Sequence, residues 1–165
     1  MLSLKSLLAT ITVALAATAS AQDKRWFEGK GQIRMMYNND PYQDLGCLTS
    51  AGKWTVDEPL CGTFEGVWIR EYNFNLTSLD PGSGPCGAVK GPLTFTCGKD
   101  VQPYSFGTLG PNVPRQGLMA LVIGQYVVFA TDGVSPPPPG GEPMSIRPWR
   151  SLDKPKWAWI GWKAL

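Results

Sequence analysis

Short apolar or alternating runs, separated by turn residues, make up the sequence beyond its N-terminal segment. No stretch there repeats apolar residues at intervals of three and four positions, as an amphipathic helix would. The runs are instead broken about every ten residues by glycine, proline or asparagine, a spacing typical of strands and tight turns. The sequence holds 19 glycines and 15 prolines, which supports this interpretation. The pattern therefore predicts an all-β chain.

Several short strands account for these runs. They are expected at residues 32–37, 45–48, 53–56, 61–69, 72–76, 86–89, 93–97, 117–124, 125–131 and 156–162. Strand alternation places Phe74 and Leu76 on one face and Asn75 on the other. The run at 117–131 is the most apolar and is expected to line the core. Many short strands with regular turns predict one antiparallel β-sandwich or small β-barrel.

A proline-rich loop is expected at residues 135–143, where four consecutive prolines precede two glycines. Proline has no amide hydrogen to donate to a sheet, so the segment is predicted to be extended and exposed. Residues 80–85, which combine aspartate, proline, glycine and serine, predict a second loop.

The N-terminal segment fits a secretory signal peptide over residues 1–21. Lys5 supplies a positive charge, residues 7–17 form an apolar stretch, and Ala19 and Ala21 give a small-x-small cleavage pattern. The apolar stretch is shorter than the roughly 20 residues that a membrane anchor needs, so we expect cleavage.

Residues 22–28 form a short segment before a single domain at 29–165. Its dibasic pair, Lys24 and Arg25, would suit a pro-segment that ends at Arg25. The whole chain has 15 basic and 13 acidic residues, and removal of the leader with Lys5 leaves 14 against 13, a net charge of +1. A chain this close to neutral argues against a nucleic-acid ligand held by bulk charge.

Four cysteines, Cys47, Cys61, Cys86 and Cys97, predict two disulfides, because an even number behind a leader is typical of secreted proteins. Four cysteines allow three connectivities. We expect the local one, Cys47 with Cys61 and Cys86 with Cys97, since each pair brackets a predicted hairpin. Wide cysteine spacing and the absence of histidine disfavour a zinc site, and no cofactor is expected.

Asn75 begins a glycosylation sequon, Asn75-Leu76-Thr77. In a secreted chain this pattern predicts an exposed, turn-adjacent asparagine that carries a glycan.

Five short motifs surround the cysteines. They are KGQI at 30–33, LGCLTSAGKW at 45–54, CGTF at 61–64, GPCG at 84–87 and FTCG at 95–98. These motifs resemble the C-terminal domain that fungal ribonucleases of the T2 family carry after their catalytic domain, and the resemblance covers roughly residues 29–131. It implies that 29–165 is an RNase T2-like C-terminal domain, here expected to stand without a catalytic domain.

The resemblance carries over no catalytic residue. T2-type cleavage moves protons with histidines, and this chain contains none. We therefore expect a protein that is not an enzyme. A Ser-Lys nucleophile or a carboxyl pair stays open as an alternative. The available carboxyls are Asp57, Glu58, Glu65, Glu71 and Asp132, and the sequence singles out no pair among them.

The last predicted strand carries the candidate ligand-binding residues. They are Trp157, Trp159, Trp162, Lys156 and Lys163. Strand alternation would place Trp157 and Trp159 on one face and Trp162 on the other. Tryptophans between lysines could stack on sugar rings or on unpaired bases, with the lysines toward phosphate. The alternative is that the strand completes the core, where tryptophan is usually buried. Trp54, which lies within the motif at 45–54, is expected in the core or packed on a disulfide.

The sequence thus predicts a secreted, non-catalytic β module, located outside the cell or in the cell wall, that binds an extracellular polysaccharide or RNA. The alternative is a secreted effector or structural protein that acts through a protein partner. A third interpretation is a hydrolase of another class. A monomer without membrane contact is expected.

Overall fold

The computed structural model describes residues 27–37, 43–70, 73–89, 94–108, 121–123, 126–129, 135–149 and 158–165. Over these residues the chain forms strands and one 3₁₀ turn, so the all-β prediction is confirmed. The main sheet has eleven strands and a separate hairpin has two. The predicted leader, the dibasic pair, and Lys156 and Trp157 lie outside the described residues.

Most predicted strands recur with small shifts at their ends. The strands are β1 Gly29–Tyr37, β2 Asp44–Leu48, β3 Lys53–Thr55, β4 Phe64–Arg70, β5 Asn73–Ser78, β6 Cys86–Val89, β7 Thr94–Cys97, β8 Phe106–Thr108, β9 Leu121–Ile123, β10 Tyr126–Phe129, β11 Met144–Ser145, β12 Arg147–Trp149 and β13 Ala158–Ala164, with the 3₁₀ turn η1 at Glu58–Leu60. Strands β8, β11 and β12 were not predicted, because all three are short. In addition, β11 follows Pro143 and β12 contains Pro148, and proline usually excludes a central strand.

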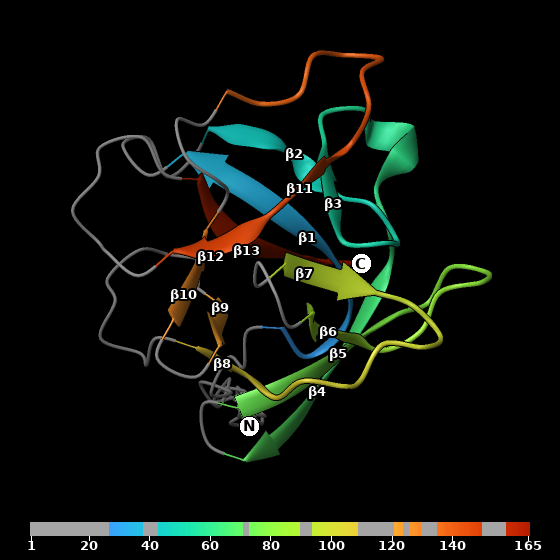
Figure 1. Ribbon diagram of the computed structural model, residues 1–165, viewed down its shortest axis with the longest axis vertical. Helices are drawn as coiled ribbons and strands as arrows, with labels where there is room; N and C mark the ends of the chain where they lie inside the picture. The colour runs from blue at the N-terminus through green and yellow to red at the C-terminus, as the bar shows by residue number, and fades with distance from the viewer. Residues whose placement is uncertain are drawn as a thin grey trace, which may run out of the picture.

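Strand β1 is the hub of the main sheet (Figure 1). One of its edges pairs with β13 from Gly31 opposite Ala164 to Tyr37 opposite Ala158. Its other edge is shared, because the first three residues pair with β4 and the second half pairs with β2. One strand therefore holds three neighbours in register.

The main sheet curls because both ends of its strand order meet in one segment. Residues 144–149 pair with β3 through β11 and with β10 through β12. Irregular registers in the β1–β2 and β4–β5 pairs, where a bulge adds local twist, support the curl. The result is a curled antiparallel half-barrel, whereas the sequence predicted a β-sandwich or a small β-barrel. The pairings at β11 and β12 span only two and three residues, too little to make a regular closed wall.

The core lies inside this curl and follows the strand alternation. Ile33 and Met35 of β1, Phe74 and Leu76 of β5, and Ile160 of β13 are fully or almost fully buried. The predicted faces of the strand at 72–76 are thus confirmed in their described part. The side chains of β9 and β10 lie outside the description, so the prediction that they line the core stays a prediction.

Phe27 belongs to the core although the domain was predicted to begin at residue 29. Its side chain is fully buried, and its ring stacks on Phe74 with centroids 4.9 Å apart. Its φ of 61° is in the left-handed region, which costs a non-glycine residue about 1–2 kcal/mol. Burial of the ring offsets this cost, so the packed domain includes residues before β1.

Two disulfides, Cys47–Cys61 and Cys86–Cys97, close short loops. This is the local connectivity that the sequence favoured. Cys86 and Cys97 are direct partners in the β6–β7 hairpin. The hairpin is attached to the rest of the fold by the Phe95 N–H, which donates to the carbonyl of Ile146 at 3.2 Å.

The proline-rich loop stays out of the sheet but folds back onto the domain. Pro136, Pro138 and Pro139 are exposed as predicted, whereas Pro137 is buried. The Gly140 N–H donates to both carboxylate oxygens of Asp57, at 2.9 and 3.1 Å. The prediction of a fully exposed segment was therefore wrong, because the Asp57 carboxylate, outside the loop, accepts the backbone N–H of Gly140 and holds the loop against the domain.

Gly66→Ala should lower the free energy of unfolding by about 3 kcal/mol or more, measured by urea denaturation. A Cβ at Gly66 would lie 1.6 Å from the carbonyl oxygen of Phe27, which is backbone and cannot rotate away. Gly98→Ala is the matched control, because its Cβ would meet only the Val101 side chain at 3.4 Å. A loss below about 1 kcal/mol at Gly66 would mean that Phe27 does not pack over β4.

Candidate functional site

Arg34 stands at the centre of β1 on the face opposite to Ile33 and Met35. Its side chain is only 8% exposed, although arginine is rarely buried unless paired. Strand β2 approaches it from one side, with Met36 opposite Asp44 in the register, and η1 brings Glu58 from the other side. The fold thus places one guanidinium between two carboxylates.

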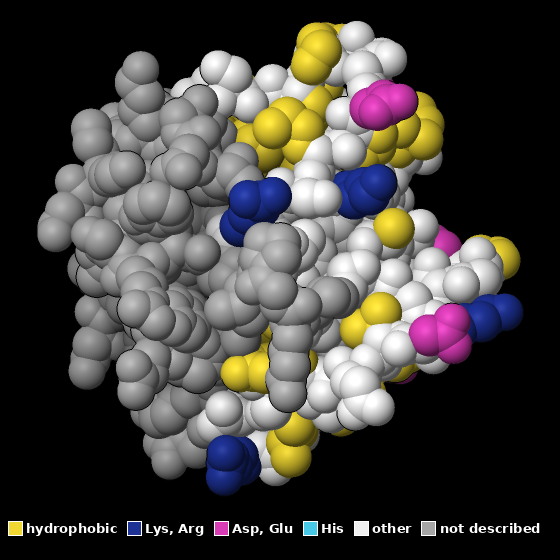
Figure 2. All heavy atoms as spheres, viewed as in Figure 1, with side chains coloured by type: hydrophobic (Ala, Val, Ile, Leu, Met, Phe, Trp, Pro, Cys, Tyr) yellow, Lys and Arg dark blue, Asp and Glu magenta, His cyan; other side chains and the backbone are white. Residues whose placement is uncertain are grey.

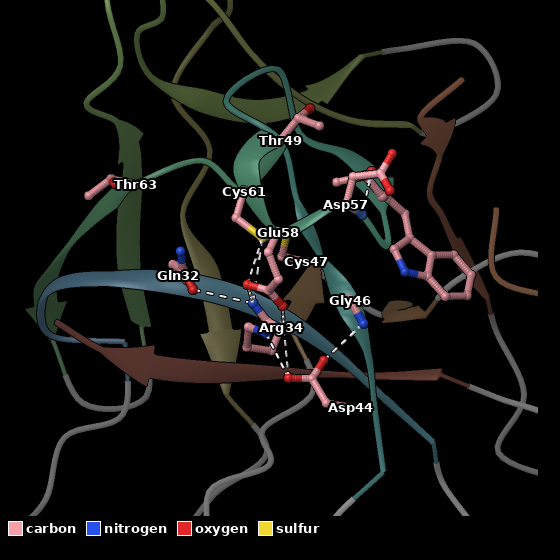
Figure 3. Close-up of a disulfide and its surroundings, with 12 residues drawn as sticks. Gln32, Arg34, Asp44, Gly46, Cys47, Thr49, Asp57, Glu58, Cys61 and Thr63 are labelled. Atoms are coloured by element: carbon pink, nitrogen blue, oxygen red, sulfur yellow. Dashed lines mark hydrogen bonds and ion pairs between the residues drawn. A yellow bond between two sulfur atoms is a disulfide. The ribbon is translucent and has the colours of Figure 1, made fainter. Parts of the chain in front are cut away.

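The guanidinium uses most of its donors on these two groups (Figure 3). Nε donates to Oδ2 of Asp44 at 2.9 Å, and Nη2 lies 2.7 Å from the same oxygen. Nη1 donates to Oε2 of Glu58 at 3.0 Å, while Nη2 donates to Oε1, which completes a two-pronged pair. Nη1 also donates to Oε1 of Gln32 at 3.3 Å. Arg34 is therefore occupied by protein acceptors.

A local turn fixes the Asp44 carboxylate. Its Oδ1 accepts the Gly46 N–H at 2.8 Å, which leaves Oδ2 for Arg34. Gly46 has a φ of +104°, and a Cβ there would lie 2.1 Å from the carbonyl oxygen of Thr55. Only glycine fits this position, because both the backbone conformation and the space exclude a side chain.

The turn η1 is held at three points, and each fixes Glu58. The Cys47–Cys61 disulfide joins the end of η1 to β2, and Arg34 pairs with Glu58 in its first turn. Asp57, just before η1, binds the proline-rich loop through Gly140. The close-up shows the disulfide directly beside the ion pair, with Nη1 of Arg34 3.5 Å from Sγ of Cys61 (Figure 3).

Arg34 and Glu58 shift each other's pKa in opposite directions. The hydrogen bonds from Arg34 lower the pKa of Glu58 below its ordinary value, and the charges of Arg34 and Lys163 act in the same direction. The hydrogen bond to Glu58 likewise raises the pKa of Arg34, against the effect of burial. Glu58 therefore stays ionised at neutral pH, which makes it a poor general acid.

Among the three predicted tryptophans, the structure describes the side chain of Trp162 alone. Trp162 lies opposite Ile33 and is half-buried, with its ring centroid 5.3 Å from that of Phe27. It also covers Gly31, where a Cβ would fall 2.4 Å from the indole. Trp162 therefore packs at the edge of the core. This agrees with the alternative interpretation of the sequence, in which the last strand completes the core. Trp54 is fully buried, and its Nε1 donates to the carbonyl of Leu45 at 2.8 Å.

The other predicted residues fall beside the Arg34 cluster or outside the description. Lys163 is exposed and lies opposite Gln32, on the face of the sheet that carries Arg34. Position 159 lies opposite Met36 and, by strand alternation, belongs to the same face of β13 as Lys163. The side chain of Trp159, like Lys156 and Trp157 as a whole, lies outside the described residues.

Asn75 lies within β5 and not beside a turn, so that part of the sequon prediction was wrong. The strand extends to Ser78 because Asn75 pairs with Val67 and Phe64 pairs with Ser78. The Asn75 side chain is half-buried on the outward face, so the predicted full exposure of this side chain was also wrong.

Sequence reasoning missed Arg34 and Asp44 and named Glu58 only as one of several available carboxyls. A signal was present, because Arg34 is the one charged residue in the run from Ile33 to Tyr37 and has no acidic neighbour in sequence. The partners could not be found, since Asp44 and Glu58 lie 10 and 24 residues away in sequence.

The described part of the chain contains neither a candidate metal site nor a candidate membrane-spanning helix. No group of three or more histidine, cysteine, aspartate or glutamate side chains there could hold a metal ion. None of the described residues forms a helix that is long and apolar enough to span a membrane.

Comparison with protein families gives one match. Residues 25–134 match the RNase T2-like C-terminal domain, so the match spans all four cysteines, Arg34, Asp44 and Glu58 but ends before β13. No curated protein and no solved structure matches the chain.

Glu58→Gln should remove a pH dependence of stability. The lowered pKa of Glu58 means that its pairing with Arg34 stabilises the fold fully above the ordinary pKa of 4.5 and progressively less as the pH falls through the lowered folded value. Urea unfolding between pH 7 and pH 3 should therefore show wild type losing its advantage over Glu58→Gln on acidification. The control is Glu142→Gln, at an exposed position of the proline-rich loop. A constant difference between wild type and Glu58→Gln over this range would contradict the pairing.

Proposed function

Because the chain belongs to the RNase T2-like C-terminal domain family, we propose that it is a secreted, non-catalytic module that binds an extracellular polysaccharide such as a cell-wall polymer. Its two disulfides fit an oxidising environment, where they form and persist. Together with the predicted leader they support a location outside the cell or in the cell wall.

The chemistry of the described residues supports a binding role over a catalytic one. The chain has no histidine to move protons near neutral pH. Its most prominent polar cluster joins Arg34 to Asp44 and Glu58, so the guanidinium is not free to bind a reacting group. The lowered pKa of Glu58 removes the carboxyl best placed to act as an acid.

The observation that carries the proposal is the register of β13 on β1. Ala158 and Ile160 are buried on the core face, where Trp162 also packs, and Lys163 is exposed on the opposite face, which it shares with the buried Gly161. This register assigns position 159 to the same face as Lys163. A tryptophan and a lysine spaced along one strand face suit a sugar chain, because the ring stacks on sugar C–H groups and the ammonium donates to hydroxyls.

Local charge favours a neutral polysaccharide over RNA. Lys163 lies near Glu58, whose pKa its charge lowers, and Lys30 of β1 lies opposite Glu65. Arg34 already binds two carboxylates. Phosphate contacts need free cations, which RNA binding reveals as a strong salt dependence. On this face the described cations each have an acidic neighbour.

One observation favours the alternative of a protein partner. Leu60 of η1 and Met144 of β11 are 48% and 37% exposed, and Pro138 and Pro139 are exposed nearby in the loop bound by Asp57. Figure 2 shows hydrophobic side chains gathered at the top of the view, over this loop and η1. A secreted effector could contact another protein there.

Trp159→Ala should reduce retention on an insoluble polysaccharide at least tenfold, since aromatic contacts are commonly dominant in binding. Pull-downs on glucan, chitin and cellulose would measure bound and free protein for wild type, Trp159→Ala and Trp159→Phe. The phenylalanine variant should keep part of the affinity, because it keeps a stacking ring. Lys163→Ala should weaken binding less, and Lys99→Ala, at an exposed turn after β7, is its control.

The same preparations would separate the alternatives. A gel shift with single-stranded RNA at two salt concentrations tests RNA, and salt-sensitive RNA binding without polysaccharide retention would replace the proposed ligand. Retention that survives Trp159→Ala with Lys163→Ala would place the site elsewhere. Ribonuclease or glycosidase activity in a clean preparation would refute the non-catalytic role. Loss of binding in Leu60→Ser alone would favour the η1 surface.

A further inference from the structure

The outward face of the β4–β5 pair carries two large exposed aliphatic side chains. Val67 is 56% exposed and Ile69 is 54% exposed, whereas Phe64 on the opposite face of β4 is fully buried. Water therefore contacts the methyl groups of both β-branched residues. Polar and charged residues flank them, because Glu65 is half-buried on one side and Arg70 is exposed on the other.

Asn75 lies directly opposite Val67 in the register of the two strands. Side chains opposite each other in an antiparallel pair have Cβ atoms about 4.5–5.5 Å apart. Thr77, the third residue of the sequon, lies on the same outward face opposite Glu65, while Leu76 between Asn75 and Thr77 is buried in the core. The sequon thus presents its asparagine beside an apolar surface.

The size of this surface indicates what covers it. A stable protein interface needs about 800 Å² from each partner, far more than two aliphatic side chains between charged groups supply. A single sugar ring matches it better, since the C–H groups of the ring and an acetamido methyl are apolar and the hydroxyls can face Glu65, Arg70 and water.

We propose that Asn75 carries an N-linked glycan whose first N-acetylglucosamine packs on Val67 and Ile69. The glycan comes from a lipid diphosphate-linked oligosaccharide in the secretory pathway, so the inference rests on secretion and not on polysaccharide binding. Nδ2 of Asn75 attacks C1 of the first sugar. The C1–N bond forms as the C1–oxygen bond to the diphosphate breaks, one amide proton passes to a base of the transferase, and the lipid diphosphate leaves.

The packed sugar stabilises the folded state by removing apolar surface from water. It also covers the outward face of β4, where two exposed β-branched residues favour association between chains. The stabilisation therefore requires both the glycan and the two aliphatic side chains. Removal of either should abolish it.

The test compares protein secreted from a glycosylating eukaryotic host with protein from a bacterial periplasm, where disulfides form without this glycan. Wild type from the eukaryotic host should be heavier by one glycan, lose that mass on treatment with an N-glycanase, and melt about 2–4 °C higher than the bacterial protein. Thr77→Ala should have the same mass and melting temperature from both hosts, whereas Thr77→Ser keeps the sequon and should behave as wild type.

The double variant Val67→Ser, Ile69→Ser distinguishes packing of the sugar on these two side chains from glycosylation of Asn75, because it removes the apolar surface and keeps the sequon. It should still gain the glycan mass, but its two preparations should melt at the same temperature. Leu60→Ser, an exposed aliphatic residue on η1, is the matched control and should keep the difference between hosts. Absence of a glycan at Asn75 in the secreted protein, or a host difference that persists in the double variant, would overturn the proposal. Neither outcome bears on polysaccharide retention.

Discussion

The two edges of β1 hold the fold together. Backbone hydrogen bonds tie this strand to β13 along one edge and to β4 and β2 along the other, so four strands depend on one register. The alternation of β1 then fixes the two faces of the domain. Ile33 and Met35 enter the core, while Gln32 and Arg34 turn toward η1. A slip of one residue would bury a guanidinium among aromatic rings and expose the core, which is why the register is strongly specified.

Arg34 shows how a buried charge can specify a structure without supplying chemistry. Its two carboxylate partners keep substantial solvent exposure, 42% for Asp44 and 60% for Glu58, so the pair does not carry the full desolvation cost of an enclosed ion pair. The guanidinium nevertheless joins β1, β2 and η1. Strand pairing also connects β1 to β2, and the Cys47–Cys61 disulfide connects β2 to the end of η1. This cluster of Arg34, Asp44 and Glu58 fixes the relative positions of the three elements beside Lys163. In the proposed binding role, the ligand would contact neighbouring side chains such as Lys163 and not the cluster itself.

The sequence predicted local features well and distant ones poorly. Turn residues and alternation located most strands, and the pairing of each cysteine with its nearer neighbour followed from hairpins around Ser50 and Lys90. The curl did not follow, because it depends on residues 144–149, where proline argued against strands and two or three pairings suffice. The burial of Trp162 could be stated only as an alternative, since strand alternation assigns faces but does not say which face is the core. Phe27 was placed outside the domain because its contacts, Phe74 and Trp162, are far away in sequence.

The pairing of β1 with β13 has a consequence for how the chain folds as it is made. Almost all of the described chain separates the two strands, so the contact order of this central pair is high, and such long-range pairing forms slowly. A chain synthesised from its N-terminus exposes one edge of β1 and the side chains of Ile33 and Met35 until β13 has been made. The two disulfides close loops of 14 and 11 residues and can form during that interval. The disulfides would restrict the partly synthesised domain to fewer conformations before β13 is available to pair with β1. At that stage the unpaired edge of β1 is most prone to aggregation.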